Sequence, residues 1–170
     1  MKLRLTFLLL ASFLKISCGQ ESFEEILQET YKDFNVQHIQ PDSLLKLNSK
    51  FYLLDTREQS EFEVSHLENA VCVGYDNFSL DSVKEFAKSD TIVVYCSIGY
   101  RSSKIAEKLQ EQGFKNVFNL YGGIFQWVNS ELPVFRKGKA IEEIHPYDIF
   151  WGKLVENPKV KKEYKPKSDK

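Results

Sequence analysis

The stretch "TIVVYCSIGYRSSKIAEKLQEQG", residues 91–113, decides the fold. It begins with five residues rich in β-branched side chains, which predict a buried strand over Thr91–Tyr95. Its second half carries apolar side chains at helical spacing and ends in Gly113, so it predicts a helix over Ser103–Gln112. A strand followed closely by a helix is the repeating unit of α/β proteins.

The rest of the chain continues this alternation. Further strands are predicted at residues 51–54, 70–73 and 117–120, and further helices at 21–35, from Pro41 onward, at 80–88 and after the strand that ends at 120. Short strands that are apolar throughout are typical of a parallel sheet with both faces covered. The sequence therefore predicts an α/β fold with a central, mostly parallel sheet and helices on both faces.

Composition restricts the function classes. The chain has 170 residues, 42% of them hydrophobic and 28% charged, which fits one globular domain. A formal net charge of −1 disfavours a general nucleic-acid binder. The three cysteines and three histidines show no metal-ligand spacing, so we expect no metal site, no cofactor and no disulfide framework.

The N-terminal residues 1–19 have the features of an export signal. A positively charged start precedes a short apolar run, Leu5 to Leu14, which is too short to span a bilayer. Ser17-Cys18 resembles the lipobox of bacterial lipoproteins, in which the cysteine is acylated, although Lys15 departs from that pattern. The alternatives are ordinary cleavage after Gly19 and an uncleaved anchor. We expect an exported protein of the cell envelope or periplasm, attached to a membrane by lipid at Cys18.

Four segments are expected after the signal. Residues 20–35 form a leading helix and tether, and residues 36–134 form the compact domain. Residues 135–155 form an extension packed on that domain, with Phe150 and Trp151 as anchors. Residues 156–170 are rich in lysine and poor in apolar side chains, so we predict a disordered tail. The protein is expected to be a monomer.

Cys96 follows the predicted strand at the point where open α/β sheets bind their ligands. The loop that comes next contains Gly99 and leads into a helix with Ser102 or Ser103 as its N-cap. Such a loop can direct its backbone N–H groups at an anion, and Arg101 adds a positive charge. The loop is therefore interpreted as a seat for a sulfur anion. Cys72 lacks these surroundings and is interpreted as a buried structural residue.

Three motifs resemble the single-domain rhodanese (sulfurtransferase) family. The family's active-site loop, C-x-x-G-x-R-[ST], stands here as Cys96-Ser97-Ile98-Gly99-Tyr100-Arg101-Ser102. Its earlier signature stands as "LLDTREQSEFEVSHLENAVCV", with Ser65 and Glu68-Asn69 as departures in a turn, and its closing pattern stands as "GFKNVFNLYGGIFQW". The resemblance covers residues 36–134.

The resemblance implies a sulfurtransferase of the thiosulfate type that works through a persulfide. Cys96 would take a sulfane sulfur from a donor, thiosulfate or a persulfide, and pass it to a thiophilic acceptor, either a small molecule or a protein thiol. The loop residues 97–101 would bind the substrate, with Ser102 in support. Asp55 and Arg57 would brace the mouth of the site as an ion pair, with contact between Arg57 and the donor as the alternative.

Two other functions remain open from the sequence. Related folds with a Cys-x5-Arg loop are phosphatases, but here four residues separate Cys96 from Arg101, which makes a tighter loop. The second alternative is an exported, non-catalytic binding module that keeps the rhodanese fold. Retention of both Cys96 and Arg101 favours the enzyme.

Overall fold

The computed structural model describes residues 21–166. The predicted signal segment and Cys18 lie outside this range, so export and acylation stay predictions. Within residues 21–166, no helix is long and apolar enough to cross a membrane.

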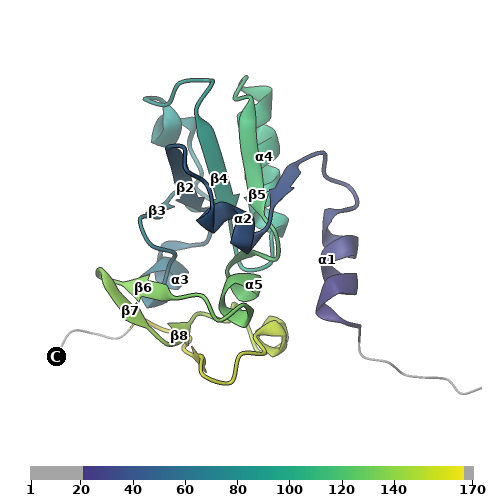
Figure 1. Ribbon diagram of the computed structural model, residues 1–170, viewed down its shortest axis with the longest axis vertical. Coiled ribbons are helices and arrows are strands. Elements are labelled where there is room, and N and C mark those ends of the chain that lie inside the picture. The colour runs from purple at the N-terminus through teal and green to yellow at the C-terminus, as the bar shows by residue number, and fades with distance from the viewer. Residues whose placement is uncertain (1–20, 167–170) are drawn as a thin grey trace, which may run out of the picture.

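The core of the fold is a sheet of five parallel strands in the order β1-β5-β4-β2-β3 (Figure 1). The strands are β1 (Gln37–Ile39), β2 (Phe51–Asp55), β3 (Val71–Cys72), β4 (Thr91–Tyr95) and β5 (Asn116–Leu120). Every pairing is parallel, as the sequence predicted. The central strand β4 has the predicted limits, and its residues from 92 to 95 are buried.

Seven helical segments accompany the sheet within residues 21–166. They are α1 (Phe23–Tyr31), α2 (Pro41–Leu45), α3 (Gln59–Val64), the 3-10 turn η1 (Leu80–Val83), α4 (Tyr100–Glu111), α5 (Gly123–Asn129) and the 3-10 turn η2 (Trp151–Leu154). The predicted helix over 80–88 is therefore wrong beyond its first turn. Asp90 accounts for the break, because its carboxylate accepts the Ala87 N–H at 2.8 Å and folds the segment into a turn.

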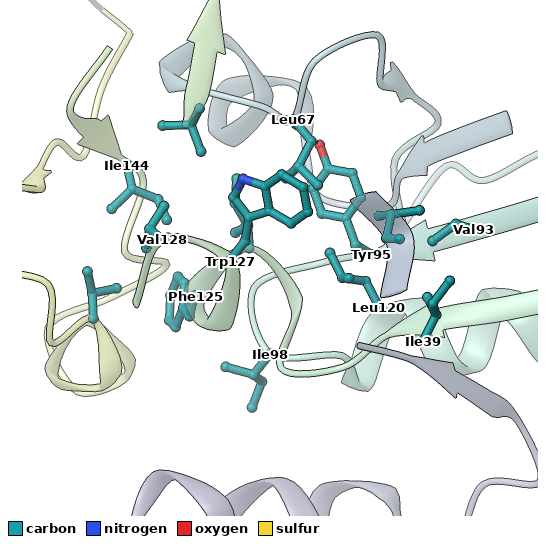
Figure 2. Packing of buried hydrophobic residues seen from close by; sticks show 14 of the residues in the cluster. Ile39, Leu67, Val93, Tyr95, Ile98, Leu120, Phe125, Trp127, Val128 and Ile144 are labelled. Carbon is teal, nitrogen blue, oxygen red and sulfur yellow. Dashed lines mark hydrogen bonds between the residues drawn. The ribbon is translucent and has the colours of Figure 1, made fainter. Parts of the chain in front are cut away.

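The two faces of the sheet bury separate apolar clusters, as the alternation of side chains along each strand requires. Leu53 and Val93 belong to one cluster, together with residues of α1, α2, α5 and the C-terminal extension. Leu54 and Val94 belong to the other, which α4 and η1 cover. Figure 2 shows part of the first cluster, where Ile144 lies beside Val128 of α5. The α/β prediction with helices on both faces is confirmed.

The C-terminal extension gathers around α5 at one end of the sheet (Figure 1). It forms an antiparallel pair, β6 (Val134–Arg136) with β7 (Lys139–Ile141), and a parallel pair, β8 (Glu143–Ile144) with β9 (Lys161–Lys162). The predicted anchors were wrong: the side chain of Phe150 is 77% exposed and that of Trp151 37% exposed. Buried aliphatic residues anchor the extension instead: Ile144, Leu154 and Val155.

The prediction of a disordered tail from residue 156 is also wrong for the part that the structure describes, residues 156–166. The backbone of this segment donates to Glu142 and Ile144 carbonyls at 2.8 and 2.9 Å, which adds β9 to β8. Asn157 also donates its side-chain amide to the Val128 carbonyl at 2.7 Å. The lysine-rich composition hid these contacts, because they use backbone and amide groups and leave the lysine side chains in solvent.

Asn129, the last residue of α5, is expected to hold the extension in place. Its side chain donates to the Leu154 carbonyl at 2.8 Å and accepts the Glu156 and Asn157 N–H groups at 2.8 and 3.3 Å. We expect Asn129→Ala to lower the free energy of unfolding by roughly 1–3 kcal/mol, because backbone groups lose their partners. Urea unfolding measures this, with the exposed Asn48→Ala as control. Equal stability of the two variants would contradict this account.

Candidate active site

The site lies where the chain connectivity of the sheet changes direction. From β2 the chain continues to β3 on one side, whereas from β4 it continues to β5 on the other. Ligands of open α/β sheets bind outside the carboxyl ends of strands at such a point. Cys96 follows β4 directly and Thr56 follows β2, and the Thr56 N–H donates to the Tyr95 carbonyl at 2.9 Å.

Cys96 is only 2% exposed, and its sulfur accepts a hydrogen bond from the Gly99 N–H at 3.1 Å. Gly99 has a φ of 107°, which a residue with a side chain rarely adopts, and it is the N-cap of α4. The helix therefore begins at Tyr100, earlier than predicted. Its first-turn N–H groups have no carbonyl partner within the helix, so they are available to an anion beside the sulfur.

The loop carbonyls are bound from the opposite side by α5. The Ile124 N–H donates to the Cys96 carbonyl at 2.9 Å, and the Phe125 N–H donates to the Ser97 carbonyl at 3.1 Å. Gly123 makes this approach possible, since a Cβ on it would lie 2.4 Å from the Cys96 carbonyl oxygen. The tandem Gly122-Gly123 was visible in the sequence, but its role was not, because the contact joins distant segments.

Gly123→Ala tests this contact. The new methyl group would push α5 away from the loop carbonyls, so we expect a loss of roughly 1–3 kcal/mol in the free energy of unfolding. We also expect an altered rate of Cys96 alkylation by iodoacetamide, measured with Cys72 replaced by serine. Gly138→Ala is the matched control, because Gly138 also has a positive φ, 73°, but nothing within 4 Å of its Cβ position. If both variants behaved alike, backbone conformation alone would explain the effect.

Tyr31 of α1 connects the two loops of the site. Its hydroxyl donates to the Ile98 carbonyl at 2.6 Å and accepts the Gly122 N–H at 2.9 Å. Burial raises the pKa of Tyr31 well above its ordinary value, so the hydroxyl stays protonated and keeps both bonds. A Cβ on Gly99 would also meet this hydroxyl, at 2.2 Å. Sequence reasoning missed Tyr31, because it precedes every motif.

Asn119 of β5 fixes the first turn of α4 through a buried network. Its amide nitrogen donates to the Gly99 carbonyl at 2.9 Å and to the Ser103 hydroxyl at 2.8 Å. Its amide oxygen accepts the Ser102 hydroxyl at 2.7 Å. Ser102 is therefore not the N-cap that the sequence suggested, but a buried support of the helix start.

Arg101 is engaged by a carboxylate. Its guanidinium makes a bidentate pair with Glu61, at 2.6 and 2.8 Å, and donates to the Ser97 hydroxyl at 3.1 Å. Burial alone would raise the pKa of Glu61, but the hydrogen bonds and charge of Arg101 outweigh it and hold that pKa below its usual value. The positive charge of Arg101, which the sequence predicted at the site, is thus already paired with Glu61. Glu61 is part of the earlier signature motif, but the sequence did not show that Arg101 is its partner.

Asp55 and Arg57 form a second ion pair behind the site. Both side chains are fully buried, and Arg57 donates to the Asp55 carboxylate at 2.6 to 3.1 Å and to the Ser65 carbonyl at 2.6 Å. This geometry supports bracing. It does not bring Arg57 to a donor, since the cavity over Cys96 is lined by other residues.

A cavity of about 300 Å³ opens over Cys96. Its lining residues are Thr30, Cys96, Ser97, Ile98, Tyr100, Arg101, Tyr147 and Trp151. Four of the five predicted substrate-binding loop residues thus line the cavity: Ser97, Ile98, Tyr100 and Arg101. The fifth, Gly99, contacts the Cys96 sulfur through its backbone N–H. Thr30, Tyr147 and Trp151 were missed, because they come from the segments before and after the motifs.

His145 holds the Tyr147 side of the cavity. Its Nδ1 accepts the Tyr147 N–H at 3.1 Å and its Nε2 lies 3.2 Å from the Tyr164 carbonyl, so the neutral ring carries its proton on Nε2. Burial lowers the pKa of His145. The positive charges of Arg57 and Arg101 also lower this pKa, whereas the charge of Glu61 and the hydrogen bond to the Tyr164 carbonyl raise it.

This arrangement predicts a pH dependence of stability. The unfolded chain protonates His145 near 6.5, whereas the folded chain resists protonation. Stability is therefore lost as the pH falls from about 6.5 towards the lowered pKa. The melting temperature of wild type should drop between neutral and mildly acidic buffer, and we expect a smaller drop for His145→Gln. His38 is present in both proteins, so its own contribution cancels in the comparison. An unchanged drop would show that His145 titrates freely.

Fold and site together define an α/β domain built around one buried cysteine at the switch point of a parallel sheet. The family model of the rhodanese-like domain matches residues 40–130, more than half of the chain. The chain belongs to the rhodanese-like domain family.

Curated relatives extend this similarity. The chain is 30% identical over 131 residues to the adenylyltransferase and sulfurtransferase UBA4 of Candida albicans, covering 71% of this chain and 29% of UBA4. It is 37% identical over 101 residues to the tRNA uridine(34) hydroxylase of Photorhabdus laumondii, covering 54% of this chain and 29% of that protein. It is 31% identical over 96 residues to the thiosulfate sulfurtransferase GlpE of Coxiella burnetii, covering 54% of this chain and 84% of GlpE. The chain thus spans less than a third of the first two relatives.

Solved structures show the same fold. A Bacillus halodurans protein superposes with a TM-score of 0.54 at 22% identity, covering 66% of this chain and 85% of that one. The rhodanese-like domain of an Anabaena protein superposes with a TM-score of 0.53 at 22% identity, covering 58% of this chain and 78% of that domain.

Proposed function

We propose that this protein is a sulfurtransferase that carries a sulfane sulfur on Cys96 as a persulfide. The observation that carries the proposal is the seat of Cys96: its sulfur accepts the Gly99 N–H and lies at the N-terminus of α4. An anionic sulfur is stabilised at such a position in both its free and its loaded form. UBA4 and GlpE are both named as sulfurtransferases, and the similarity of this chain to them supports the same reaction.

The proposed cycle has two displacement steps. The Cys96 thiolate attacks the outer sulfur of a donor R–S–S⁻, so that Cys96–S–S⁻ forms and R–S⁻ leaves. A nucleophilic acceptor such as cyanide then attacks the outer sulfur, releasing thiocyanate and restoring the thiolate. Neither step needs a base, because each nucleophile is already an anion: the Cys96 thiolate in the first step and cyanide in the second. The first-turn N–H groups of α4 support the outer sulfur where its negative charge resides.

Cys96→Ser is expected to abolish sulfur transfer, with cyanide-dependent thiocyanate release as the assay. The fold should persist, because the hydroxyl can still accept the Gly99 N–H. Cys72→Ser is the control. Cys72 is half-buried, burial raises the pKa of its thiol, and the thiol donates to the Arg57 carbonyl at 3.5 Å. We therefore expect the Cys72→Ser variant to transfer sulfur at nearly the wild-type rate.

The persulfide itself is detectable by mass. Incubation with a sulfane donor should add one sulfur atom to the wild-type protein and to Cys72→Ser, but not to Cys96→Ser. If the folded wild-type protein neither gained this mass nor released thiocyanate with any donor, the result would favour the non-catalytic binding module over the enzyme. If Cys96→Ser transferred sulfur at the wild-type rate, Cys96 would not be the residue that carries the sulfur.

A further inference from the structure

The cavity over Cys96 has walls that come from outside the shared domain. The family match covers residues 40–130, whereas Thr30 belongs to α1, and Tyr147 and Trp151 belong to the C-terminal extension. The loop of Cys96 thus supplies the floor, while segments outside the family match supply part of the wall. The wall can distinguish one donor from another, because the reacting sulfur of every donor meets the same Cys96 loop and only the rest of the donor meets the wall.

The wall is aromatic and nearly uncharged. Of the lining side chains, all within the described residues, Arg101 is the one cation, and its charge is paired with Glu61. The guanidinium also lies 5.0 Å from the centre of the Tyr147 ring, which covers one of its faces. An inorganic dianion such as thiosulfate therefore meets no unpaired side-chain cation among the lining residues, which include three aromatic rings. Desolvating a charge without a partner is costly.

The volume fits a larger molecule than thiosulfate. About 300 Å³ lies at the lower end of the range typical of small-molecule pockets. The aromatic side chains that border it offer faces against which an apolar group can pack: Tyr100, Tyr147 and Trp151. Such a group would be removed from water without leaving an unpaired polar atom.

The Tyr147 side of the wall is already in position. Tyr147 has a φ of 66°, an unusual conformation for a residue with a side chain, and its N–H is held by His145. Its ring is further fixed against Arg101. A wall held in one conformation loses little entropy when a ligand binds, which favours affinity for a ligand of matching shape.

We propose that this site selects sulfur donors with a single charge at the reacting sulfur and an apolar, preferably aromatic, body, and that Tyr147 and Trp151 determine this selectivity. The proposal rests on the sulfurtransferase function. For a thiosulfonate donor the step is balanced: the Cys96 thiolate and R–SO₂–S⁻ give Cys96–S–S⁻ and the sulfinate R–SO₂⁻. The body R would lie between the aromatic rings while the outer sulfur reaches Cys96.

The test compares benzenethiosulfonate with methanethiosulfonate and thiosulfate, using cyanide as the acceptor. Wild type should show a higher kcat/KM for the benzene donor than for either other donor. Trp151→Ala and Tyr147→Ala should lower the ratio of the benzene to the methane donor by at least about tenfold, the range set by lost apolar contacts. Phe150→Ala is the matched control, since Phe150 is an exposed aromatic neighbour that does not line this cavity, and it should keep the wild-type ratio.

A measurement on the wild-type protein covers the case of a variant that folds poorly. Benzenesulfonate, which donates no sulfur, should slow the alkylation of Cys96 by iodoacetamide, whereas methanesulfonate at equal concentration should not. Two results would overturn the proposal and leave sulfur transfer itself intact. The first is equal protection of Cys96 by benzenesulfonate and methanesulfonate. The second is an unchanged ratio of kcat/KM for the benzene and methane donors in folded Trp151→Ala and Tyr147→Ala. Absence of transfer from all three donors would instead contradict the sulfurtransferase function itself.

Discussion

The site depends on one backbone contact, in which the N-terminus of α5 binds the carbonyls of Cys96 and Ser97. This contact turns the loop so that its carbonyls face α5 and its Gly99 N–H faces the sulfur. Two helix N-termini therefore meet at one loop, α5 on the carbonyl side and α4 on the sulfur side. Because the Cys96 and Ser97 carbonyls and the Gly99 N–H each have a partner within the fold, the cysteine can remain buried without leaving these backbone groups unpaired.

Both arginines near the site are neutralised by carboxylates. Arg57 is paired with Asp55 in the interior, and Arg101 with Glu61 beside the cavity. Buried pairs of this kind add little net stability, but breaking one leaves an isolated buried charge. The Arg57 pair joins the carboxyl end of β2 to the Ser65 carbonyl after α3, and the Arg101 pair joins the start of α4 to α3. The result is a site in which the attraction for an anion comes mainly from oriented backbone dipoles, and these act only over short distances.

The sequence predicted what depends on local patterns and missed what depends on distant contacts. The strand before Cys96, the glycine loop and the α/β class could be predicted, because β-branched runs, helical periodicity and a glycine at a turn are local signals. The start of α4 was wrong because Ser102 binds Asn119, a residue of another strand. Tyr31 and Tyr147 carry no motif of their own, and only the folded chain brings them to Cys96. The lysine-rich tail looked solvated because its ordering contacts are made mainly by backbone atoms and the Asn157 side chain, which give no apolar signal in the sequence.

The hydrogen bond from Tyr31 to the Cys96 loop also has a mechanical consequence. Its hydroxyl contacts Ile98 on one loop and Gly122 on the other, and its Cα lies at the C-terminal end of α1. A pull on α1 from its N-terminal end would act on this hydroxyl, on the buried side chain of Leu27 and on the hydrogen bond from the Tyr121 hydroxyl to Glu24. Displacement of the Tyr31 hydroxyl would leave the Ile98 carbonyl and the Gly122 N–H without the partner that joins the two loops. Force applied to α1 would thus reach the loops around Cys96 through a side chain that lies outside the matched family domain.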